Sequence, residues 1–335
     1  MYQRFYGFVE HPFNLTPDPR YLYLTKRHGE ALAHLEYALT CRKGVTVLIG
    51  EVGTGKTILL RTALGRVQSS PLHCAKIWNP TLSRREFYQF LTAEFGLTPA
   101  AAESKARFLI ELDKAVKRHH AVGGVTALVV AEAQALSLEL LEEIRLLANM
   151  ETDTEKLLQV ILVGQPELSE RLNRPELRQL KQRVAMRCSL GPLDLRETGA
   201  YIAGRLRIAG GEPAQIFSRE AIEEVYQRSQ GIPRLIGVIC DNALVTGFAL
   251  GVRPIGRSVI LDVCRDFEFQ ASAVDTPAVE PTQPWTAAAD EGPARGIERA
   301  DVTEHAPNTS RPGSPESTAT RGFKLFSSAS GERSA

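Results

Sequence analysis

Two glycines, a lysine and a threonine within residues 50–57 have the spacing of a phosphate-binding loop. The stretch reads G-E-V-G-T-G-K-T and fits the pattern G-x-x-x-x-G-K-[ST] at every fixed position. In such a loop the backbone N–H groups surround the β-phosphate, the lysine reaches the β- and γ-phosphate oxygens, and the hydroxyl ligates Mg²⁺. The sequence therefore predicts a site for ATP and Mg²⁺, with Thr57 as the metal ligand. The loop residues are Gly50, Glu51, Val52, Gly53, Thr54, Gly55, Lys56 and Thr57.

The residues on either side of this loop must hold it in place. Residues 45–49 read V-T-V-L-I, a short apolar stretch rich in β-branched residues that is typical of a buried strand. Residues 56–67 have a helical pattern, so the loop joins the end of a strand to the start of a helix. The positive dipole end of that helix faces the anion, and this context favours phosphate binding over an incidental glycine-rich turn.

A second apolar strand, predicted at residues 125–130, ends where a carboxylate is expected but absent. P-loop NTPases normally place an Asp at this point to hold Mg²⁺, and in many of them a Glu follows and polarises the attacking water. Here the strand is followed by Ala131 and Glu132. We expect Glu132 to be the catalytic base, with an ordinary acid at the start of a helix as the alternative. Without the Asp, ATP binding should survive better than hydrolysis.

Two more polar residues follow elements that can bring them to the γ-phosphate. The strand predicted at 157–163 is followed by G-Q-P-E-L, which places Gln165 where it can orient the lytic water, unless it is a plain turn residue. Residues 231–234 read G-I-P-R and open a helix, because Pro suits the first helical turn. Arg234 can then fold back over the nucleotide; a surface Arg at a helix start is the alternative.

A basic segment at residues 177–187 can supply charge to a neighbouring subunit. An arginine donated across a subunit interface can neutralise the charge that develops on the γ-phosphate. Arg183 is the favoured residue for this role and Arg178 is the second choice. A solvated basic face is the alternative, because surface arginines are common.

The elements around these residues alternate between strands and helices. Strands that are apolar on both faces and separated by helices predict a parallel sheet covered on both sides, an α/β P-loop NTPase sandwich. After Pro192 the pattern becomes purely helical, which predicts a small α-helical lid. We expect a nucleotide-binding core at 1–191, a lid at 192–268 and a disordered tail at 269–335. The predicted helices are 28–42, 56–67, 84–94, 104–119, 136–149, 168–173, 178–184, 195–209, 218–229, 233–250 and one from 257, with a further strand at 74–78.

The composition of the chain limits its location and partners. Net charge is +1 over 335 residues, so the whole chain is not a polycation built to coat nucleic acid or anionic membrane. The five cysteines are scattered without a CxxC pair, as in a reducing compartment, and no metal cluster can be drawn from them. The amino-terminal residues lack a signal-peptide pattern, and the apolar stretch 238–252 is too short to span a bilayer. We expect a cytoplasmic protein.

Taken in order, these parts resemble the AAA+ ATPases of the general secretion pathway protein A family, which includes pilus-biogenesis and exosortase-associated exopolysaccharide ATPases. The resemblance covers residues 1 to about 268 and implies an AAA+ core, a helical lid and a ring-shaped homo-oligomer. It also implies that Gln165 and Arg234 are the two nucleotide sensors and that Tyr23 lies near the adenine. The motifs that carry it are Y-G-F at 6–8, H-P-F at 11–13, L-T-P-D-P-R-Y-L-Y at 15–23, residues 50–57, E-A-Q at 132–134, G-Q-P-E-L at 164–168, Q-R at 182–183 and G-I-P-R at 231–234.

The chain departs from this family in two ways. Ala131 stands where the family has Asp, and we expect this protein to act without the transmembrane helix and peptidoglycan-binding part of secretion-type members. We therefore expect an ATPase that serves an envelope secretion, pilus or exopolysaccharide machine through partners, from the cytoplasm or the inner face of the membrane. The alternatives are a non-hydrolysing nucleotide sensor or scaffold, and an ATP-dependent DNA-binding ATPase of the transposition type. Near-neutral charge argues against nucleic acid as a partner.

Overall fold

The computed structural model describes residues 1–14, 16, 18–67 and 71–267. The tail predicted at 269–335 lies outside these residues. Five parallel strands form one sheet in the order β2 (Leu72–Ile77), β3 (Val125–Val130), β4 (Leu158–Gly164), β1 (Val45–Gly50) and β5 (Val184–Leu190). The three central strands are buried along their whole length, as their apolar sequences predict. The α/β fold class is confirmed.

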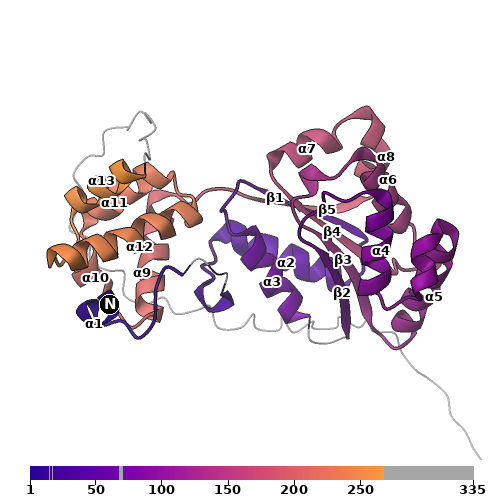
Figure 1. Cartoon of the computed structure of the whole chain (residues 1–335), viewed down its shortest axis with the longest axis horizontal. Helices are drawn as coiled ribbons and strands as arrows, with labels where there is room; N and C mark the ends of the chain where they lie inside the picture. The colour runs from indigo at the N-terminus through magenta and orange to yellow at the C-terminus, as the bar shows by residue number, and fades with distance from the viewer. Residues whose placement is uncertain (15, 17, 68–70, 268–335) are drawn as a thin grey trace, which may run out of the picture. The chain divides into compact units, whose positions relative to one another are not determined.

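Alternate residues of these strands enter two different cores, one on each face of the sheet (Figure 1). On β3, Leu128 packs with one core and Val129 with the other. Helices α2 (Lys26–Thr40) and α3 (Lys56–Arg66) cover one face. The other face is covered by α4 (Arg84–Glu94), α5 (Lys105–Ala121), α6 (Leu138–Leu147), α7 (Pro166–Leu172) and α8 (Arg178–Gln182). The result is a three-layer sandwich in which the carboxyl ends of all strands share one edge.

The edge strand β5 begins where the sequence predicted the end of a helix. A helix was predicted to run to residue 184, but α8 ends at Gln182 and the strand begins at Val184. Residues in the first half of β5 alternate between half-buried and exposed, because this strand pairs with β1 on one side only. A half-exposed edge strand lacks the continuous apolar run that identified the central strands.

A separate group of helices follows β5. It consists of α9 (Leu195–Ile208), α10 (Pro213–Ile216), α11 (Arg219–Ser229), α12 (Pro233–Leu250) and α13 (Arg257–Asp266). Helix α9 starts with a capping box in which Asp194 and Glu197 satisfy each other's backbone N–H groups. Among the described residues, only α12 is long and apolar enough to span a membrane, and one side of it is packed in the core of this helical unit. A core helix of a globular domain meets the same criteria.

The first residues of the chain complete the core of this helical unit. Short helix α1 (Tyr2–Tyr6) and the segment after it bury Tyr6 and Phe13 against α9 and α12. The Tyr2 hydroxyl donates to Asp241 Oδ1 at 2.6 Å, which ties α1 to α12. The sequence patterns grouped this segment with the nucleotide-binding core. Neither α1 nor its packing was predicted, because its contacts join distant residues, 239 positions apart for Tyr2 and Asp241.

Candidate functional site

The loop at residues 50–57 bends in a way that its glycines allow. Gly53 and Gly55 have φ angles of +85° and +95°, in the left-handed region that other residues rarely adopt. A side chain on Gly53 would also meet Arg234, because its Cβ would lie 2.7 Å from the Cβ of Arg234. The backbone N–H of Arg234 donates to the Gly53 carbonyl at 3.2 Å. The loop therefore contacts the start of α12 directly.

Lys56 is the first residue of α3 and is 7% exposed. Its Nζ donates to the carbonyl oxygens of Gly50 at 2.7 Å and Glu51 at 2.8 Å, so the ammonium group holds the loop in its curved form. Burial lowers the pKa of Lys56, and the charges of Glu132 and Glu51 oppose that shift. A buried cation beside the backbone of a glycine-rich loop is a fitting partner for phosphate oxygens.

A cavity of about 350 Å³ lies over this loop. Four parts of the chain line it: the loop with the start of α3, described residues between Phe13 and His28, Glu132 after β3, and the helical unit through Tyr201, Arg205 and Arg234. Of the predicted site residues, those in the lining are Val52, Gly53, Thr54, Gly55, Lys56, Thr57, Tyr23, Glu132 and Arg234. Gly50, Glu51, Gln165 and Arg183 are not in the lining.

Glu132 and Gln165 come together at the edge where β3 and β4 end. Gln165 Nε2 donates to Glu132 Oε2 at 3.1 Å, and Gln134 Nε2 donates to the same oxygen at 2.6 Å. Gln134 Oε1 in turn accepts from the Gln165 backbone N–H at 3.1 Å. Burial raises the pKa of Glu132, but these hydrogen bonds and the charge of Lys56 outweigh it, so the net pKa is lowered. A carboxylate beside the cavity and in contact with an amide can act on a water molecule there.

Glu132 has an unusual backbone conformation for a residue with a side chain. Its φ of +50° places it in the left-handed region, immediately after Ala131. Such conformations are concentrated at functional sites, where surrounding contacts hold them. The sharp turn brings Glu132 from the sheet edge to the cavity, where Lys56 and Thr57 also lie.

Ala131 places a methyl group at the end of β3, where P-loop NTPases normally have an Asp that holds Mg²⁺. Its backbone N–H donates to the Ile77 carbonyl at 2.8 Å, which extends the pairing of β3 with β2 by one residue. No group of three or more His, Cys, Asp or Glu side chains within the described ranges is placed to hold a metal ion. For an ion in the cavity, the lining offers the hydroxyl of Thr57 and the carboxylate of Glu132.

Arg183 lies at the opposite end of the sheet from the loop, whereas Arg178 is the first residue of α8. Val184, next to Arg183, pairs with Val45 at the start of β1, whereas Gly50 at its end pairs with Leu190. Six strand residues separate the two ends, a span of roughly 17 Å. Arg183 is therefore distant from the cavity over the loop of its own chain.

His28 lines the cavity, although no motif in the sequence predicted it there. It is 4% exposed, and its Nε2 lies 3.2 Å from the Thr54 carbonyl oxygen. Because a carbonyl oxygen only accepts, Nε2 carries the proton, and Nδ1 then accepts from the Thr25 hydroxyl at 2.8 Å. A histidine on the buried side of an amphipathic helix gives no sequence signal that separates this contact from plain core packing.

We expect His28 to make folding stability sensitive to mild acid. Burial lowers its pKa, and the hydrogen bond to Thr54 opposes this only in part. Below the ordinary histidine value of 6.5 the unfolded chain takes up a proton that the folded chain refuses, so stability is full above that pH and falls as pH drops. The slope for one proton is at most about 1.4 kcal/mol per pH unit.

His28→Gln keeps an N–H that can donate to Thr54 and does not titrate. Urea unfolding at pH 7.5 and pH 5.5 should show that wild-type protein loses more stability over this interval than the variant does. Equal losses in the two proteins would show that His28 does not carry this dependence.

A parallel sheet in the order β2-β3-β4-β1-β5, a phosphate-binding loop after β1, and a helical unit that reaches the loop through Arg234 together define an AAA P-loop NTPase. The comparisons agree. Residues 40–172 match the family model described as AAA domain. The ORC2 protein of Aeropyrum pernix, in a structure of ADPNP-ADP complexes, has a TM-score of 0.58 at 17% identity, with 77% of this chain and 72% of that chain covered. A Walker-type ATPase of Pyrococcus abyssi has a TM-score of 0.53 at 20% identity, with 77% of each chain covered.

A sequence relative narrows the class. General secretion pathway protein A of Aeromonas hydrophila is 43% identical over 256 residues, which is 76% of this chain and 46% of the relative. The chain belongs to the AAA ATPases related to general secretion pathway protein A, the family that its motifs resemble. It spans about half the length of that relative.

Proposed function

We propose that this protein binds Mg²⁺–ATP and uses its binding and hydrolysis, to ADP and phosphate, to drive the assembly or operation of a cell-envelope machine. The observation that carries the ATP site is the cavity over Lys56, in which the phosphate-binding loop meets Arg234 of α12 and the aromatic side chain of Tyr23. The name of the general secretion pathway relative supports the envelope role. We assign the protein to the cytoplasm, where a secretion, pilus or exopolysaccharide machine can recruit it to the membrane.

Within this site each predicted residue has a defined task. The loop N–H groups and Lys56 bind the β- and γ-phosphates, and Thr57 ligates Mg²⁺. Glu132 accepts a proton from the attacking water, which Gln165 helps to orient through their shared hydrogen bond. Arg234 senses the γ-phosphate from α12, and Tyr23 lies against the base.

Hydrolysis in this arrangement needs a second subunit. The position of Arg183 at the far end of β5 supports a homo-oligomeric ring in which each chain supplies this arginine to its neighbour's nucleotide. Removal of such an arginine lowers turnover by a factor of about 1,000 or more in other P-loop NTPases.

A non-hydrolysing nucleotide sensor is the second candidate, and the methyl group of Ala131 at the end of β3 favours it. DNA binding is supported less well. The ORC structure from Drosophila is bound to DNA, but its 20% identity to this chain shows the fold alone, and the net charge here is +1.

The proposal is tested with the wild-type protein. Calorimetry should show saturable ATP binding that Mg²⁺ strengthens, and phosphate release should require Mg²⁺ and rise more than linearly with protein concentration as rings form. Binding without turnover at any concentration would favour the sensor. ATP-dependent DNA binding with a steep salt dependence would favour the DNA-binding class.

A further inference from the structure

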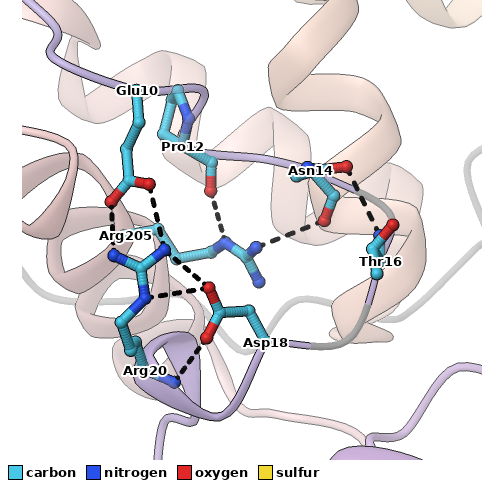
Figure 2. Close-up of polar contacts among 7 residues, drawn as sticks. All are labelled: Glu10, Pro12, Asn14, Thr16, Asp18, Arg20 and Arg205. Atoms are coloured by element: carbon cyan, nitrogen blue, oxygen red, sulfur yellow. Dashed lines mark hydrogen bonds and ion pairs between the residues drawn. The ribbon is translucent and has the colours of Figure 1, made fainter.

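One arginine of α9 holds a segment near the start of the chain that lines the cavity. We call the described residues of 8–23 the strap. Figure 2 shows the guanidinium group of Arg205 facing two backbone carbonyls of this strap. Arg205 Nε donates to Pro12 O at 2.7 Å and Nη2 donates to Asn14 O at 3.4 Å, while Nη1 donates to the Tyr201 hydroxyl at 2.8 Å. All three nitrogens of the group are therefore used.

The same guanidinium group lies among three aromatic rings. Its carbon is 4.7 Å from the ring centre of Tyr21, 5.3 Å from that of Tyr201 and 5.8 Å from that of Phe13. Phe13 is 2% exposed and Tyr21 is 5% exposed, so these contacts are largely shielded from water. A shielded cation–aromatic contact is stronger than an exposed one. Arg205 thus attaches the strap to α9 in two ways: its N–H groups donate to strap carbonyls, and its charge lies against the rings of Phe13 and Tyr21.

The strap has a second fastening within itself. Arg20 donates to both carboxylate oxygens of Glu10, at 3.1 and 3.0 Å, and to Asp18 Oδ2 at 2.9 and 2.7 Å (Figure 2). These groups are exposed, and exposed ion pairs contribute little to stability. Arg20 therefore sets the shape of the strap, whereas Arg205 attaches it to the helical unit.

The strap supplies several of the cavity-lining residues that lie outside the phosphate-binding loop. Phe13, Asn14, Asp18, Tyr21 and Tyr23 all line the same cavity as Lys56. Arg205 itself contacts no residue of the loop among its hydrogen bonds and ring contacts. We propose that Arg205 is a positioning residue that builds the base-side wall of the nucleotide site by fixing the strap to α9. This assignment rests on the proposed ATP function. It predicts that Arg205 affects the binding of the base and not the binding of the phosphates.

This difference can be tested, because a general loss of structure would weaken the binding of both kinds of ligand. Dissociation constants are measured for ATP and for inorganic tripolyphosphate, both with Mg²⁺, on wild type, Arg205→Ala, Arg205→Lys and Arg207→Ala. Arg207 is an exposed arginine on the same helix and is the matched control. Arg205→Ala should weaken ATP binding by about tenfold, as expected for lost anchoring hydrogen bonds, and leave tripolyphosphate binding within about twofold.

Arg205→Lys should recover part of the ATP affinity, because it keeps the charge among the rings but loses the planar set of donors. Equal weakening of both ligands by Arg205→Ala, or unchanged ATP binding, would overturn the assignment. A wild-type protein that binds neither ligand would refute the proposed ATP site itself, which is a different result from either of these.

Discussion

Replacement of Lys56 by alanine is expected to weaken Mg²⁺–ATP binding by about 100-fold and to reduce phosphate release to background. Among the described residues of the loop, the Lys56 ammonium group is the one buried cation. Charge-assisted hydrogen bonds to phosphate are worth about 1.5–3 kcal/mol each, which corresponds to a factor of about 10 to 100 in affinity. Titration calorimetry with ATP measures the change.

The control must separate lost phosphate binding from a collapsed loop. Lys56 also holds the carbonyls of Gly50 and Glu51, so Lys56→Ala can loosen the loop, and thermal unfolding should be measured in parallel. Lys56→Arg retains a cation, and Lys114→Ala removes an exposed lysine from α5 on the opposite face of the sheet. If Lys56→Ala binds ATP within about threefold of wild type while its unfolding temperature is unchanged, residues 50–57 are not the triphosphate site.

The parts of this molecule that could be predicted depend on local signals. The loop, the central strands and the helices around them follow from runs of a few residues, since a strand buried on both faces must be apolar throughout. Ala131 and Glu132 could be located because the end of β3 is defined by that same run. Their proximity to Gln165 follows from parallel neighbouring strands, whose carboxyl ends share an edge.

The parts that could not be predicted depend on contacts between distant residues. The hydrogen bond from Arg205 to Pro12 spans 193 positions, and no pattern within α9 distinguishes this arginine from the exposed Arg207. Phe13 and Tyr21 belong to motifs that carry the family resemblance, but their burial against the helical unit could be seen only in the folded chain. A single sequence records which side chains are apolar and not which distant surface they cover.

The missing carboxylate at the end of β3 gives the second large expected effect. Ala131→Asp adds an oxygen ligand at the sheet edge where P-loop NTPases hold Mg²⁺ and its waters, next to the cavity that contains Thr57. Because the substitution leaves the loop N–H groups and Lys56 in place, ATP affinity should stay within about threefold. Mg²⁺-dependent phosphate release should rise by about tenfold, the gain expected from about 1.4 kcal/mol of better transition-state stabilisation. Steady-state turnover at saturating ATP measures it.

Glu132→Gln shows whether that gain passes through the proposed base. Gln keeps a side-chain oxygen that can accept from Gln134 and Gln165 but cannot take a proton at neutral pH, so the turnover of wild type and of Ala131→Asp should both fall to background when it is introduced. ATP binding should persist in these variants, since Glu132 does not hold the phosphates. If wild type already turns over rapidly and Ala131→Asp adds nothing, the metal is held well without an Asp, and the sensor alternative is wrong. If Ala131→Asp is faster and Glu132→Gln abolishes the gain, this chain binds ATP at an intact phosphate site whose rate of hydrolysis is limited by one methyl group.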